Sequence, residues 1–282
     1  MRITATVLSL LCSVICSWAD DTLRTEIRVT YNYHKIFVRG EDGVVESDTP
    51  MTLLANTHNS KFYNSHSEYL DSLKSTPSGR AKWNEISRVA AHQFLETRNM
   101  ESLAPTTYPS YLYLFKSADR QTLTLYDNAG LNEYGVYTEP LFEMEWEICD
   151  STRSILGYEC ILAQTSYHGR DWQAWFAPDI PLPDGPWKLG GLPGLILEAT
   201  ESDGHHSFTA TGFVKSDEEM HPVYLKDRYD RMSRKDMLRS LRAYRDNGNA
   251  MIKASTNLDF GSQPTPALDL TKYDFLETDY HE

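Results

Sequence analysis

The sequence has few cysteines, few basic residues and no long apolar run beyond its first residues. Two of its four cysteines, Cys12 and Cys16, lie within that first run. No later stretch offers the roughly 20 apolar residues that a membrane-spanning helix needs. The 27 Lys and Arg are outnumbered by 40 Asp and Glu, which gives a formal net charge of −13. Because nucleic-acid binding depends on Lys and Arg at phosphates, this balance argues against nucleic acid as a partner.

Familiar catalytic and metal-binding motifs are also missing. The glycine-rich stretch from Gly190 to Gly194 lacks the Lys-Ser or Lys-Thr pair of a phosphate loop, and Pro193 removes an N–H donor. An esterase elbow would need a Ser between its glycines. The nine histidines include no His-Glu-x-x-His pattern. We therefore predict no catalytic residue, no metal ion and no cofactor. The alternative is a metal site assembled from distant segments, which no local spacing would reveal.

The first residues predict an export signal. Arg2 gives a short positive start, residues 3–15 are almost free of charge, and Ser17-Trp18-Ala19 has the small residues of a cleavage site. We expect a signal peptide over residues 1–19 and a mature protein in the periplasm or outside the cell. The mature chain then has no transmembrane segment.

The two cysteines of the mature chain, Cys149 and Cys160, predict a disulfide across a hairpin. An even number of cysteines in an exported chain favours a disulfide, and a turn is expected over residues 150–157. The alternative is a redox-active pair, but such pairs are usually separated by two residues beside a helix N-terminus. We therefore expect a structural disulfide.

Alternating apolar and polar residues predict a mainly β chain. Residues 142–148 place four apolar side chains on one side and three glutamates on the other. Further strands are expected over residues 25–31, 51–55, 60–63, 111–115, 121–126, 158–166, 172–177, 195–200 and 207–214. Short strands between turn residues are typical of an antiparallel sheet or barrel. We predict one domain, residues 20–282, with a curved antiparallel sheet or half-open barrel and two or three packed helices.

Helical spacing and capping residues predict those helices. The first begins at Ser65, with a capping box to Glu68, and the second covers residues 80–97. A third is expected from Ser233 to Gly248, where the glycine would end it. The acidic tail that follows is expected to lie on the domain as extended chain.

The glycine-rich stretch is predicted to be a structural corner. Pro193 and Gly194 suit the two central positions of a type II turn, in which the glycine has a positive φ. Apolar residues after Gly194 then enter the sheet. The signature that we expect to form this corner comprises Gly185, Pro186, Gly191, Leu192, Pro193, Gly194, Leu195 and Ile196.

The same stretch resembles the GLPGLI family of exported bacterial proteins. The residues that carry the resemblance are Gly191 to Ile196, Gly157-Tyr158-Glu159-Cys160 with Ala163, Ala174-Trp175-Phe176, Ile180-Pro181, Gly185-Pro186 and Ser60 to Tyr63. Together they cover about the middle two-thirds of the chain. The resemblance implies export by a Gram-negative cell, and it implies no activity.

Four tryptophans surround this signature in the sequence, and we expect them to face a ligand cavity between sheet and helices: Trp146, Trp172, Trp175 and Trp187. The alternative is that they are core, since strands favour aromatic residues. We predict a periplasmic binding or carrier protein, without enzymatic activity, for an apolar ligand or an envelope protein. The alternative is a structural or interaction protein of the envelope with no cavity. A hydrolase has the least support, because it needs a nucleophile, a base and an orienting group brought together.

Overall fold

The computed structural model describes residues 23–40, 43–256 and 274–280. For residues 23, 37–40, 43 and 247–256 only the backbone is described. The predicted signal peptide, residues 1–19, lies outside the described residues. In the described part of the chain, no helix is both long enough and apolar enough to cross a membrane.

The chain forms a mainly β structure with three α-helices in its described part. The elements are β1 Leu23–Arg24, β2 Ile27–Gly40, β3 Gly43–Ala55, β4 Asn59–Tyr63, α1 Ser65–Ser75, α2 Pro77–Thr97, η1 Met100–Thr106, β5 Tyr113–Ser117, β6 Thr122–Gly130, β7 Glu133–Pro140, β8 Glu147–Ile155, β9 Tyr158–Tyr167, β10 Arg170–Ala177, β11 Leu195–Glu201, β12 His206–Lys215, β13 Glu219–Met220, η2 Lys226–Arg228, β14 Asp230–Arg231 and α3 Arg234–Thr256.

Twelve strands form one open sheet in the order β14-β7-β6-β5-β4-β3-β2-β12-β11-β10-β9-β8. Every neighbouring pair is antiparallel except β14 and β7, so the sheet is mixed. The prediction of a mainly β chain with packed helices is confirmed. The sheet is larger than expected, and among the described strands β14 and β8 form its two edges, so it does not close into a barrel.

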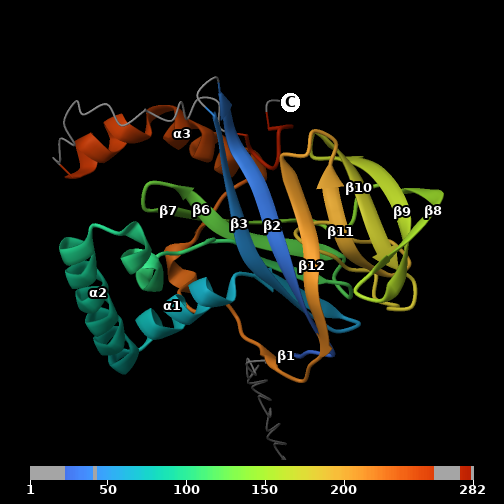
Figure 1. The fold of residues 1–282 in the computed structure, drawn as a ribbon, viewed down its shortest axis with the longest axis horizontal. Helices are drawn as coiled ribbons and strands as arrows, with labels where there is room; N and C mark the ends of the chain where they lie inside the picture. Colours follow the sequence, from blue (N-terminus) through green and yellow to red (C-terminus); the bar gives the residue numbers. More distant parts are fainter. Residues whose placement is uncertain (1–22, 41–42, 257–273, 281–282) are drawn as a thin grey trace, which may run out of the picture.

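The sheet twists strongly and encloses the main core. In Figure 1, β6 and β7 pass behind β2, β3 and β12, while β8 to β10 lie at the right of the molecule. One hydrophobic cluster joins these parts, with Leu125 of β6, Trp172 of β10 and Phe208 of β12 all buried. A smaller cluster on the opposite face contains Tyr63, Tyr113 and Met220, with Tyr229. The sequence-distant strands are thus held by shared apolar burial.

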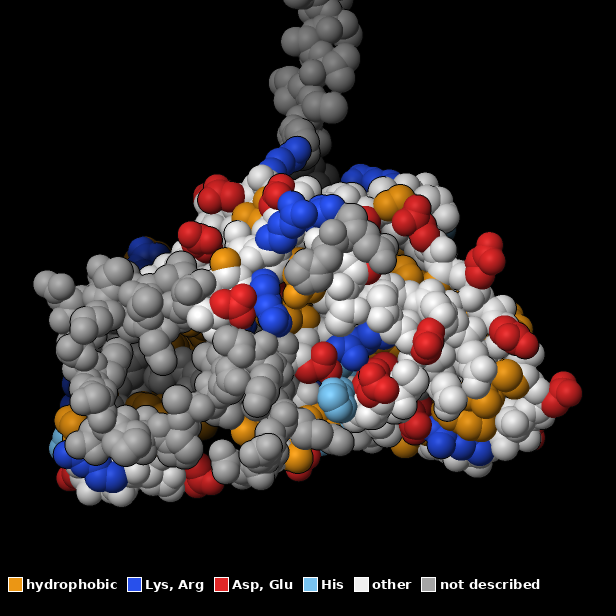
Figure 2. All heavy atoms as spheres, turned by 90° about the horizontal axis from the view of Figure 1, so that it is seen from above, with side chains coloured by type: hydrophobic (Ala, Val, Ile, Leu, Met, Phe, Trp, Pro, Cys, Tyr) orange, Lys and Arg blue, Asp and Glu red, His pale blue; other side chains and the backbone are white. Residues whose placement is uncertain are grey.

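The acidic composition is visible at the surface. Figure 2 shows Asp and Glu side chains spread over one face, with Lys and Arg between them and hydrophobic side chains only in small groups. On this face, exposed apolar side chains are thus scattered between charged ones rather than joined in one large patch.

The helices begin and end differently from the prediction. The side chain of Asn64, rather than that of Ser65, caps α1 by accepting from the N–H of Ser67 at 2.8 Å. Thr76 caps α2 in the same way, with Gly79 as donor. α3 continues past Gly248 to Thr256, so the glycine does not end it. Residues 274–280 lie against the domain, as expected for the acidic tail, and the part before them lies outside the described residues.

The strand predicted over residues 142–148 is wrong for most of its length. β8 begins only at Glu147, and Phe142 has a φ of +55°, which is incompatible with a strand. The side chains alternate over residues 143–145, where Met144 is buried while Glu143 and Glu145 are exposed, but Ile148 is 52% exposed rather than buried with the others. Burial on one side of an extended segment therefore gave alternating apolar and polar residues, although this segment pairs with no neighbouring strand in the described part of the chain.

The predicted disulfide between Cys149 and Cys160 is contradicted, because both cysteines are free. β8 extends through the expected turn to Ile155, and this places Arg153 opposite Cys160. Cys149 lies instead within a register irregularity between Ile148 and Thr152. A disulfide needs Cα atoms within about 7 Å of each other, and the register of the longer strand does not place Cys149 opposite Cys160.

The glycine-rich corner is present, but its turn is of another type. Gly194 N–H donates to the Leu192 carbonyl at 2.8 Å, which closes a three-residue turn around Pro193. The φ of Gly194 is +157°, not the roughly +80° of a type II turn. A side chain at Gly194 would lie 2.3 Å from the carbonyl oxygen of Ala177, so close backbone approach explains the glycine. Leu195 then begins β11, as predicted.

Candidate functional site

A groove of about 510 Å³ lies between α3, the β6–β7 hairpin and the chain that precedes β5. The C-terminal residues 274–277 and the β2–β3 hairpin complete its walls. We call this cavity the aromatic groove, because many aromatic rings line it: Tyr33, Tyr108, Tyr111, Tyr134, Tyr137, Trp187, Tyr244 and Phe275. In Figure 1, α3 lies above the β6–β7 hairpin that forms the opposite wall.

Tyrosines before β5 form a rigid platform in the groove. The rings of Tyr108 and Tyr111 stack with centroids 4.9 Å apart, and Tyr134 meets Tyr111 edge to face at 5.9 Å. The hydroxyl of Tyr108 donates to Asp71 Oδ1 at 2.8 Å, and Asp71 is completely buried. Arg228 also donates to Asp71 at 2.9 Å. The carboxylate of Asp71 therefore holds Tyr108 in place, and the guanidinium of Arg228 neutralises the charge of that carboxylate.

The opposite end of the groove is polar, and Asp274 is its centre. Its carboxylate accepts from Arg170 at 2.6 Å and lies 2.8 Å from His205 Nδ1. Nε2 of the buried His206 lies 3.4 Å away, and Nδ1 of that ring bonds the hydroxyl of Tyr33 at 2.9 Å. Burial favours the neutral acid, but the bonds from His206, His205 and Arg170 outweigh it and lower the pKa of Asp274. Asp274 is thus ionised at neutral pH.

Asp127 of β6 behaves in the opposite way. Burial raises the pKa of its carboxyl to about 6, although the N–H of Asn128 donates to it at 2.7 Å. Lys35 and Arg245 also favour the charged form, while Glu277 disfavours it. The groove therefore holds Asp127, which exchanges its proton near pH 6, and Asp274, which stays charged. Two carboxyl groups with such different pKa values are typical of acid–base sites.

Beside the groove, a buried cluster of ion pairs contains a trio that could hold a metal ion: His168, Glu277 and Asp279. The trio is already neutralised by cations. Lys188 Nζ lies 2.9 Å from Glu277 and 2.6 Å from Glu139, and Arg234 pairs with both Glu277 and Asp279. A metal ion would have to displace these cations, so the cluster is best explained as ion pairs that join the tail to the sheet.

The sequence-predicted residues mostly serve the fold. Of the four tryptophans, only Trp187 lines the groove, and it is 2% exposed. Trp172 is fully buried in the core, and Trp146 bonds the Gly190 carbonyl through Nε1 at 2.8 Å. The ring of Trp175 is covered by the guanidinium of Arg153 at 4.2 Å. The structure therefore places Trp187 at the groove and the other three tryptophans outside its lining.

The signature segment is closely packed and lies outside the lining of the groove. Gly185 and Ile196 pack together, since a side chain at Gly185 would lie 2.8 Å from Cβ of Ile196. Gly190 and Gly191 lie against the ring of Phe142. None of the eight signature residues lines the aromatic groove. They bend the backbone and bury apolar surface.

Sequence reasoning missed the residues that the structure brings together in the groove. Asp127, Asp274 and the tyrosines at 108, 111 and 134 come from separate segments and carry no local motif. One signal was present, because three tyrosines occur within Tyr108 to Tyr113, just before a strand. That density of large amphipathic rings near a strand end could have indicated a binding surface.

A family model described as "N-glycanase peptide, N-terminal domain" matches residues 115–246. This match runs from β5 into α3, and it includes β6, β7 and the signature segment. No match was found among curated protein sequences. The family model that matches is thus not that of the GLPGLI family, and our assignment to the GLPGLI family is corrected accordingly.

Two solved structures of PNGF-II resemble the chain. The one in the P21 crystal form has 16% sequence identity and a TM-score of 0.50, and it covers 77% of this chain. The one in the C2 form has 16% identity and a TM-score of 0.49 over 78% of this chain. The first of these shows a similar fold. The chain spans about a third of the PNGF-II chain, since 34% of that chain is covered.

These comparisons overturn the functional prediction. The match to an N-glycanase domain relates the chain to an enzyme, which contradicts the prediction of a protein without enzymatic activity. The same match contradicts the predicted carrier for an apolar ligand, and neither that prediction nor the purely structural envelope protein is kept. The groove agrees with this correction, because its walls mix aromatic rings with charged groups rather than being uniformly apolar.

Proposed function

We propose that this chain is an N-glycanase-like protein that binds the carbohydrate of N-glycosylated proteins in the aromatic groove. The observation that carries the proposal is the stacked pair Tyr108 and Tyr111 in a cavity of about 510 Å³. Ligand sites have volumes of roughly 300–1,000 Å³, so the groove suits a few sugar residues. The match to an N-glycanase domain supports the same class of ligand.

The chemistry of the groove suits a sugar. One side of a sugar ring presents C–H groups, which are attracted to the electron-rich faces of aromatic rings. Its hydroxyls need acceptors and donors, and Asp274 and Asn128 provide both at the groove wall. Because Asp71 holds Tyr108 in place, little side-chain freedom is lost on binding.

An N-glycanase hydrolyses the amide bond that joins the first sugar to asparagine. Water adds to the amide carbon, the C–N bond breaks, and the nitrogen that leaves with the sugar needs a proton donor. We assign that role to Asp127, whose pKa of about 6 keeps part of the population protonated near neutral pH. The export signal predicted over residues 1–19 belongs to the same proposal, since N-glycosylated substrates occur outside the cytoplasm.

A titration with a fluorescent N-glycopeptide tests this proposal. We expect saturable binding that Tyr111→Ala weakens about tenfold, equivalent to about 1.4 kcal/mol, because half of the stacked pair is lost. The control is Tyr69→Ala, an exposed tyrosine of α1 outside the groove. Release of the glycan, followed by mass spectrometry, should be lost in Asp127→Asn while binding persists. Equal binding by Tyr111→Ala and the control would contradict the proposal.

A further inference from the structure

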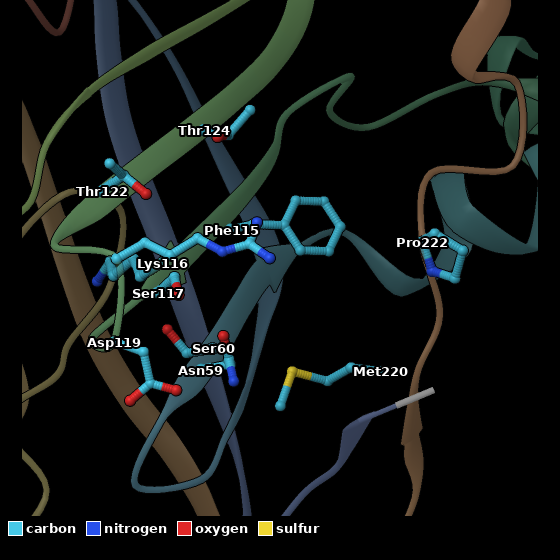
Figure 3. Close-up of a pocket in the computed structure, with 11 residues that line it drawn as sticks. Asn59, Ser60, Phe115, Lys116, Ser117, Asp119, Thr122, Thr124, Met220 and Pro222 are labelled. Carbon is cyan, nitrogen blue, oxygen red and sulfur yellow. The ribbon is translucent and has the colours of Figure 1, made fainter. Parts of the chain in front are cut away.

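A second cavity, of about 450 Å³, lies on β4, β5 and β6 and is closed at one side by the chain around Met220 and Pro222. We call it the β4–β6 pocket (Figure 3). It shares no lining residue with the aromatic groove. A ligand there would therefore bind independently of the first site.

Strand register places three hydrogen-bonding side chains in a row across this pocket. Asn59 of β4 pairs with Ser117 of β5, and Ser117 pairs with Thr122 of β6. Directly paired residues present their side chains on the same face of a sheet. Within the described part of the chain, none of these three side chains has a hydrogen-bond partner, so all are available to a ligand.

The turn between β5 and β6 adds one charge of each sign. Asp119 Oδ1 bonds His58 Nδ1 at 3.0 Å, and the second carboxylate oxygen has no bond among the described residues. Arg120 is exposed and makes no ion pair or hydrogen bond with any described residue. Both lie in the pocket wall, so it offers strong acceptors and several N–H donors together.

One wall of the pocket is apolar. Phe115 lies two residues before Ser117 on the same face of β5. In Figure 3 its ring lies between the polar side chains of the strands and Pro222. The ring is held edge to face against Tyr126, with centroids 6.1 Å apart. Met220 is 4% exposed and belongs to the smaller hydrophobic cluster with Tyr63 and Tyr113. A fixed apolar wall faces a row of donors and acceptors.

This combination selects among ligand classes. The single carboxylate of Asp119 argues against a metal ion, and its presence beside Arg120 argues against phosphate, as does the net charge of −13. The polar row argues against a lipid. A neutral sugar ring matches both kinds of lining. Its hydroxyls can bond Asn59, Ser117 and Thr122, while its apolar side packs against Phe115.

We propose that the β4–β6 pocket is a second saccharide-binding site, which takes one or two neutral sugar residues. For the class of ligand the inference rests on the proposed function, but its residues are separate from those of the aromatic groove. Two independent sugar contacts on one chain would raise the avidity for a branched or clustered glycan when both can be engaged at once.

Amide chemical shifts of the ¹⁵N-labelled protein, titrated with the methyl glycosides of mannose, galactose and N-acetylglucosamine, test the proposal. We expect one of the three to shift the amides of residues 59, 117 and 119–122 saturably. Arg120→Ala and Thr122→Val should each weaken that binding at least fivefold. Arg120 is exposed and Thr122 is half-buried, and neither side chain has a hydrogen-bond partner among the described residues, so the melting temperature should change little. Arg88→Ala on α2 is the matched control.

The outcomes separate the two proposals. If the glycosides shift the amides around Tyr111 but never those around Thr122, the second site is refuted and the aromatic groove stands. If both pocket variants bind as tightly as the control does, the second site is also refuted. If glycosides and glycopeptide leave every amide unchanged, the proposed function itself fails.

Discussion

The ammonium group of Lys116 donates to Asp184 Oδ1 at 2.6 Å deep inside the protein, where the lysine is 3% exposed. It also donates to the carbonyl oxygens of Gly185 and Leu189, at 2.9 and 2.8 Å. One lysine of β5 therefore satisfies three acceptors of the segment that carries the glycine-rich signature. Burial lowers the pKa of Lys116, and the carboxylate of Asp184 counteracts this.

We expect Lys116→Met to lower the free energy of unfolding by about 3–5 kcal/mol, because the carboxylate of Asp184 would stay buried without its cation. Thermal and urea unfolding measure this. The double variant Lys116→Met with Asp184→Leu should recover part of the loss, since no charge is then buried alone. Stability equal to that of the unchanged protein in the single variant would show that the pair does not hold the segment.

The close approach at Gly194 gives a second prediction. Gly194→Ala should lower stability by about 1–3 kcal/mol, because the added carbon would lie 2.3 Å from the Ala177 carbonyl oxygen. Gly212→Ala is the matched control in β12, since a side chain there meets nothing within 4 Å. Calorimetry compares the two variants, and equal melting temperatures would mean that the corner is not tightly packed.

The parts of the fold that could be predicted are those whose sequence pattern lies within a single strand or helix. Short strands such as β4 and β11 and the helix α2 follow from alternation, periodicity and capping within one segment. The error at residues 142–148 arose because one-sided burial gives the same alternation with or without a pairing strand. The disulfide prediction was wrong for a related reason, because β8 covers most of residues 150–157, where the turn between the cysteines was expected.

The candidate site was less predictable than the fold. Tyr33, Tyr108, Asp127 and Asp274 meet only after β2, β6 and the C-terminal tail have been placed around α3. Asp127 is one of 40 acidic residues, and nothing in its neighbours reveals that burial will raise its pKa. Such sites depend on tertiary placement, which no short motif in this chain encodes.

The raised pKa of Asp127 predicts a pH-dependent effect on stability. Its folded-state pKa of about 6 exceeds the unfolded value of about 3.9, so the folded state binds the proton more tightly. Its contribution is then fully present below about pH 4 and is lost as the pH rises through 6. We expect Asp127→Asn to raise stability at pH 8 by about 1–3 kcal/mol and to have little effect at pH 4. A gain that is the same at both pH values would contradict the assignment.

The free cysteines predict unequal reactivity. Cys149 is partly exposed and should react with a thiol reagent in the native protein. Cys160 is completely buried, and burial raises the pKa of its thiol, so it should react only after unfolding. Mass spectrometry counts the labels. If no thiol reacts in denaturant without a reductant, the two cysteines are bonded after all.

The location of bound glycan tests the central claim most directly. An N-glycopeptide that carries a photoreactive diazirine on its sugar can be cross-linked to the protein, and the labelled peptides can be mapped by mass spectrometry. We predict labels within residues 108–112, 127–134 and 238–245, which form the walls of the aromatic groove. Specific labelling that omits all three segments, or no labelling above that of a sugar-free peptide, would contradict it.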